Sequence, residues 1–72
     1  MSDAETRECE RLAFVAGRDG VLAALAFAQQ GFRQYTAALR EAESGGNQYG
    51  AAYADSLNAS LIVYKSYISR NE

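Results

Sequence analysis

The side chains that could carry out chemistry in this sequence are few and far apart. Cys9 is the only cysteine, Lys65 is the only lysine, and histidine does not occur. A serine or cysteine nucleophile usually needs a histidine or lysine base beside it, and no such pair is visible. Glu8 and Glu10 are neighbours on a predicted helix, where we expect them to face solvent rather than converge in a pocket. The sequence therefore predicts that the chain is not an enzyme.

Metal and cofactor sites are also not expected. Zinc and copper prefer nitrogen and sulfur ligands, of which the chain has a single thiol. An oxygen-only site would need clustered carboxylates, and those in the middle of the chain are scattered (Asp19, Glu41, Glu43 and Asp55). The glycines of segment 17–20 lack the spacing and the preceding strand of a phosphate-binding loop.

Size and charge set further limits. The 72 residues predict a single domain, residues 1–72, with a net charge of −2 that favours neither nucleic acid nor an acidic membrane. The N-terminal residues do not predict a signal peptide, and the longest apolar stretch, 21–28, is too short to span a bilayer. A lone cysteine fits a reducing cytoplasm, which we take as the expected location.

The elements that would position these residues are all predicted to be helices. Proline does not occur and almost half of the residues are hydrophobic, 49%. The first helix is predicted over about 3–16, with Ser2 and Glu5 as a capping box. Its apolar face is expected to bury Cys9 as a small hydrophobic residue, together with Leu12, Ala13 and Ala16. Gly17 would end this helix and Asp19 would cap the next one.

Two longer helices, over about 20–43 and 48–69, carry heptad seams. The seam of the first steps +4, +3 without a break through Val21, Leu25, Ala28, Phe32, Tyr35, Leu39 and Ala42. The seam of the second steps +3, +4 through Ala54, Leu57, Leu61, Tyr64 and Ile68. Gly31 in mid-helix suggests that another helix approaches closely there. The turn residues 44–47 join the two helices.

These elements predict an all-α fold: an antiparallel helical hairpin preceded by a shorter helix. Each long helix would be more than about 30 Å long, and the short helix could cover only about half of that length. We therefore expect a second copy to bury the remaining apolar surface in a homodimer.

Several apolar residues lie off the seams. Phe27 is expected to lie under the first helix and Phe14 to close the corner at Gly17. Ile62 lies among polar residues on one face of the third predicted helix. The sequence leaves open whether it is buried or contacts a partner. Four of the five tyrosines lie on or beside the third helix's apolar face, which favours a protein interface there.

Protein–protein binding is the function that these patterns favour, as a regulator, inhibitor or adaptor. Phage- or plasmid-encoded inhibitors, anti-CRISPR proteins among them, would fit that description. The residues expected to contact the partner are Tyr49, Ile62, Val63 and Tyr67. One alternative is a nucleic-acid-binding regulator that uses Arg33 and Arg40, although no basic cluster surrounds them. The other is a structural subunit of a larger assembly.

Overall fold

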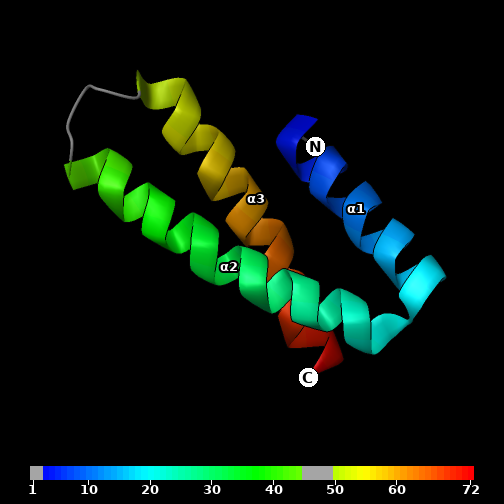
Figure 1. Cartoon of the computed structure of the whole chain (residues 1–72). Helices are drawn as coiled ribbons and strands as arrows, with labels where there is room; N and C mark the ends of the chain where they lie inside the picture. The colour runs from blue at the N-terminus through cyan, green and yellow to red at the C-terminus, as the bar shows by residue number, and fades with distance from the viewer. Residues whose placement is uncertain (1–2, 45–49) are drawn as a thin grey trace.

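The computed structural model describes residues 3–44 and 50–72, and all but two of these residues are helical. α1 spans Asp3–Asp19, α2 spans Val21–Ser44 and α3 spans Gly50–Asn71. The three helices pack against one another in an elongated body of 39 × 21 × 18 Å (Figure 1). The predicted all-α fold, with a shorter helix before a two-helix hairpin, is confirmed.

The hairpin of α2 and α3 forms because the two heptad seams face each other. The two helices run antiparallel, and α1 turns back from the start of α2 to lie beside α3 (Figure 1). Most of the predicted turn, and Tyr49, fall within residues 45–49, which are outside the described residues. The described ends of the hairpin, Ser44 and Gly50, lie one and two residues after the predicted helix limits, 43 and 48.

The corner between α1 and α2 differs from the prediction. α1 continues through Gly17 and ends at Asp19, so Gly17 is not the stop and Asp19 does not cap α2. Gly20 makes the corner instead, because its φ of 97° lies in the left-handed region that glycine tolerates. Its amide donates to the carbonyl of Ala16 at 3.0 Å, and its carbonyl accepts from the amide of Ala24 at 3.1 Å. One residue therefore ends one helix and begins the next.

α1 runs parallel to α3, with its first turn beside residues 52–59 and its last turns near Arg70. Its buried face agrees with the predicted one only in part, at Leu12 and the half-buried Ala16. The residues of α1 that are buried are Ala4, Glu8 and Leu12, spaced four apart. Cys9, which we expected inside, is exposed, and so is Ala13. The face turns in this way because α1 lies over both other helices and directs Glu8 between them.

The core is small and centres on Tyr64. The buried cluster around it consists of Leu12 of α1, Ala28 of α2 and Val63 and Tyr64 of α3. Five partly buried side chains pack around this cluster: Phe27, Phe32, Tyr35, Tyr67 and Ile68. Four more hydrophobic residues are buried elsewhere between the helices: Ala4, Ala24, Ala42 and Leu57. Most seam positions thus face inward as predicted. Val21 does not, because it is the first residue of α2 at the corner, where 51% of it is exposed.

The close approach predicted at Gly31 is confirmed. A Cβ on Gly31 would lie 2.8 Å from Cε2 of Tyr64, which is closer than non-bonded carbon atoms tolerate. The Tyr64 ring also packs edge-on against Phe27, with 6.3 Å between centroids, and tilted against Tyr35 at 5.5 Å. Glycine is therefore needed in mid-helix because α3 places an aromatic ring on it.

Two of the three off-seam residues remain largely exposed. Phe27 packs against the core and lines the crevice with α1, as expected. Phe14 does not close the corner: it is 63% exposed, and the guanidinium of Arg18 lies over its ring, at 5.2 Å. Ile62 is 59% exposed.

Candidate functional site

A carboxylate is buried where the three helices meet. Glu8 is fully buried, and its Oε2 accepts a hydrogen bond of 2.8 Å from the Tyr64 hydroxyl. Its Oε1 lies 3.5 Å from Nη1 of Arg11 but has no hydrogen-bond partner among the described residues. The expectation that Glu8 faces solvent is wrong, because the tyrosine hydroxyl and the arginine compensate the burial of its charge.

The Tyr64 hydroxyl is held in its neutral form by this environment. Burial of the ring raises the pKa of Tyr64 above its ordinary value, and the hydrogen bond to the negative Glu8 raises it further. The bond from this neutral hydroxyl joins α3 to α1 inside the core. We therefore call Glu8 and Tyr64 the joint of the fold.

Within 3–44 and 50–72, acidic and cysteine side chains do not gather in groups of three or more that could hold a metal ion. No described helix has the length and apolar character needed to cross a membrane.

On one side of α1, small and apolar side chains line an α1–α3 groove. It consists of two adjoining hollows of about 300 and 390 Å³, which share Cys9, Val63 and Arg70. The α1 wall includes three short side chains, Cys9, Ala13 and Ala16, beside Leu12 and Glu5, and the groove stays open to solvent. Ile62 stands on the α3 side of this groove.

Three of the four predicted partner-binding residues come together in this groove, but they are not equally accessible. Ile62 is exposed, whereas Val63 is only 7% exposed and belongs to the core. Tyr67 is half-buried, and the guanidinium of Arg70 lies 5.8 Å from its ring centroid. The structure therefore leaves Ile62, rather than Val63, as the side chain that another protein could contact.

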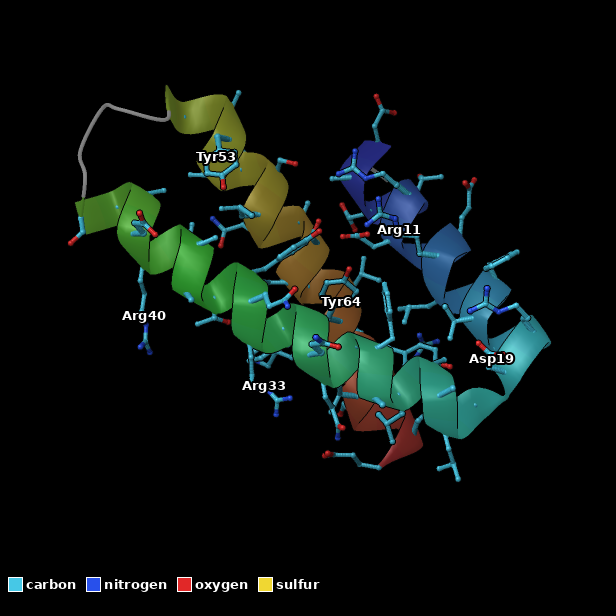
Figure 2. All side chains as sticks on the ribbon, viewed as in Figure 1. Arg11, Asp19, Arg33, Arg40, Tyr53 and Tyr64 are labelled. Atoms are coloured by element: carbon cyan, nitrogen blue, oxygen red, sulfur yellow. The ribbon has the colours of Figure 1, made fainter. Side chains whose placement is uncertain are left out.

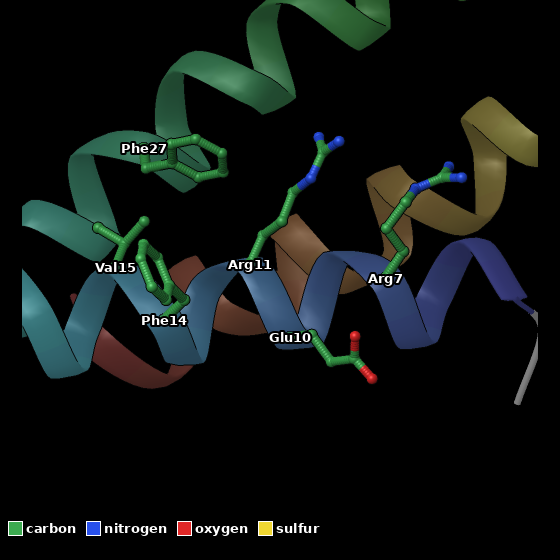
Figure 3. Close-up of a pocket in the computed structure, with 6 residues that line it drawn as sticks. All are labelled: Arg7, Glu10, Arg11, Phe14, Val15 and Phe27. Atoms are coloured by element: carbon green, nitrogen blue, oxygen red, sulfur yellow. The ribbon is translucent and has the colours of Figure 1, made fainter.

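On the other side, an α1–α2 groove of about 570 Å³ opens beside Phe14. Phe14, Val15 and Phe27 gather at one end of it, and Arg7 and Arg11 extend from α1 over the same side (Figure 3). Sequence reasoning missed this surface. The signal for it was the +4, +3 spacing of Arg7, Arg11 and Phe14, which marks one stripe of a helix.

The two arginines of the nucleic-acid alternative share one exposed face. Arg33 and Arg40 project from α2 on the side away from α1 and α3 (Figure 2). Gln29, one turn before Arg33, donates to the Glu72 carboxylate at 3.1 Å, which brings a negative charge to this face. A pair of arginines next to a carboxylate gives weak attraction to phosphates, so this alternative gains no support from the structure.

Comparison with known proteins adds no information on function. The chain matches no protein-family model, no curated protein and no solved structure.

Proposed function

We propose that this chain works by binding another protein in its α1–α3 groove, as a small regulator, inhibitor or adaptor. The observation that supports the proposal most directly is Ile62, a 59% exposed isoleucine at the edge of an apolar groove. An exposed isoleucine alone is ordinary, but one beside an open groove with apolar walls offers a contact that another protein can bury.

The shape of the groove indicates what the partner presents. Cys9, Ala13 and Ala16 of α1 are short and lie across from larger side chains of α3, so this part of the groove can accept bulky side chains from outside. Its walls are two parallel helices, and an amphipathic helix that carries large apolar residues on one face fits such a surface. We propose a helix of this kind as the occupant, within a protein of the cytoplasm, where the exposed thiol of Cys9 stays reduced.

The only cysteine of the chain lies in this groove and provides the test. Alkylation of Cys9 with N-ethylmaleimide adds a bulky group there without changing any charge. The immobilised chain is used to capture proteins from its host, in four forms: untreated, alkylated, Cys9→Ser, and Cys9→Ser after the same treatment. A specific partner is captured by all forms except the alkylated wild-type chain. Ile62→Glu should lose the same protein while keeping its helicity.

The four forms separate groove binding from other causes. If the alkylated wild-type chain captures the protein as well as the alkylated Cys9→Ser chain does, the groove is not the binding site. If Ile62→Glu also captures it undiminished, the proposed surface is wrong. Circular dichroism of each form checks that the fold is retained.

A further inference from the structure

Exposed apolar side chains concentrate at the corner between α1 and α2. Phe14, Val21 and Leu22, which are 63%, 51% and 81% exposed, are three of the five large hydrophobic residues that the described part of the chain exposes. They fall within nine consecutive residues, around the single-residue corner at Gly20. A cluster of this kind on a small helical body indicates a contact surface.

Opposite charges lie at equal distances on either side of Phe14 on α1. Glu10, Phe14 and Arg18 lie four residues apart, so they form one ridge along the helix, with a negative charge at one end and a positive charge at the other. Glu10 makes no ion pair within residues 3–44 and 50–72. Arg18 is bound by Asp19 at 2.8 Å, but 63% of its side chain is exposed, so it retains donors for another carboxylate.

We infer that a second copy of the chain covers this ridge, with the two α1 helices antiparallel and the two Phe14 rings facing each other on the twofold axis. In that alignment Glu10 lies against the partner subunit's Arg18, and Arg18 against the partner subunit's Glu10. A ridge whose charge reverses about its centre is complementary to itself only in the antiparallel direction. This is the requirement of an isologous dimer, in which each contact occurs twice.

A residue beside the ridge fits the same alignment. Gly17, which has open space around it, flanks the ridge and adds no side chain that would keep the two α1 helices apart. The net charge of −2 is small enough to allow two copies to approach.

This dimer is independent of the proposed function. It uses the α2 side of α1, whereas the α1–α3 groove with Cys9 and Ile62 lies on the other side. Each dimer would therefore present two α1–α3 grooves. The sequence predicted a dimer because the seams of the hairpin would be left uncovered. The dimer inferred from the structure rests instead on a specific ridge of α1.

Charge exchange tests the pairing directly. In Glu10→Arg the new arginine would face the partner subunit's Arg18, and in Arg18→Glu two glutamates would face each other. Each single variant should weaken dimerisation about tenfold, because each pair occurs twice in the dimer. The double variant Glu10→Arg/Arg18→Glu restores opposite charges and should return to within about threefold of the wild-type dissociation constant. Sedimentation equilibrium over a range of concentrations measures it.

Matched controls separate this interface from general charge effects. Arg33→Glu makes the same charge change as Arg18→Glu, on the far face of α2, and should leave the dimer unchanged. Phe14→Ser removes the central ring without altering charge and should yield the monomer, 7.8 kDa, while circular dichroism stays the same. A wild-type chain that stays monomeric up to millimolar concentration overturns the proposal. A double variant that associates no better than the single variants also overturns it.

Discussion

Tyr64 contacts all three helices with one side chain. It belongs to α3, its hydroxyl donates to Glu8 of α1, and its ring lies on Gly31 of α2. Only 1% of it is exposed, so water cannot replace the hydrogen bond that it gives to the carboxylate. The stability of the molecule should therefore depend strongly on a single oxygen atom.

Tyr64→Phe removes that oxygen and keeps the ring. We expect the free energy of unfolding to fall by about 1.5–3 kcal/mol, because the buried carboxylate of Glu8 loses its hydrogen bond. Urea denaturation followed by circular dichroism measures the change. Tyr67→Phe is the control. Because Tyr67 is partly exposed, this substitution should change the free energy of unfolding by less than about 0.5 kcal/mol. Equal effects of the two variants would contradict the assigned role of the hydroxyl.

The same hydroxyl predicts how stability depends on pH. The pKa of Tyr64 is raised in the folded chain, so the unfolded chain releases this proton first as the pH rises. The stabilisation is complete below the unfolded tyrosine pKa of about 10 and declines above it. The difference in unfolding free energy between wild type and Tyr64→Phe should therefore shrink from pH 8 to pH 10.5. A difference that stays constant over this range would show that Tyr64 ionises equally in both states.

Residue types alone did not reveal this joint. By residue type, a glutamate in the middle of α1 is expected to face solvent, and a cysteine near Leu12 is expected to be buried. In the structure the glutamate is buried and the cysteine is exposed. The reversal depends on a partner 56 residues away in the chain, which a helical pattern does not contain. The buried residues Ala4, Glu8 and Leu12 are spaced four apart in the sequence. This spacing was not recognised as a buried face because Glu8 is charged.

At the scale of the elements, two glycines inside helices should respond oppositely to alanine. Gly17→Ala should stabilise the chain by about 0.5–1 kcal/mol, because a Cβ there meets nothing within 4 Å and alanine favours helix. Gly31→Ala should destabilise it despite the same gain, because the Cβ would clash with the Tyr64 ring. That ring cannot move aside easily while its hydroxyl is bound to Glu8. Thermal unfolding of both variants checks this, and a stabilised Gly31→Ala would refute the close packing.

The inward faces of the long helices were predictable, whereas for the short helix only its presence and its start were. The heptad seams of α2 and α3 repeat often enough that one neighbour explains them, and their inward faces are confirmed at Ala28, Ala42 and Leu57. α1 has fewer turns and touches two neighbours, so its face could not be read from one seam. The C-terminal end of α1 was predicted too early, at Gly17, because glycine often ends a helix. The glycine that ends it is Gly20, which has the positive φ that this turn requires.

At the scale of the whole molecule, the hairpin should not fold without α1. Leu12 covers the core at Ala28 and Tyr64, and removal of residues 1–19 would expose that core and leave Tyr64 without Glu8. A chain of about 50 residues with no disulfide buries too little surface to be stable alone. We expect the shortened chain to lose cooperative thermal unfolding, as followed by circular dichroism. A sharp transition near that of the full chain would show that α1 is dispensable.

The corner at Gly20 has a consequence for how this chain can vary among its relatives. Only one non-helical residue separates α1 from α2, so the rotation of one helix about its axis is tied to that of the other. Inserting a single residue there would turn α1 by about 100° and move Phe14 and Cys9 onto different sides of the body. Length changes are therefore expected between α2 and α3 and not at Gly20. In an alignment of relatives, gaps should fall within 45–49, and the distance in sequence from Glu8 to Gly31 should stay constant.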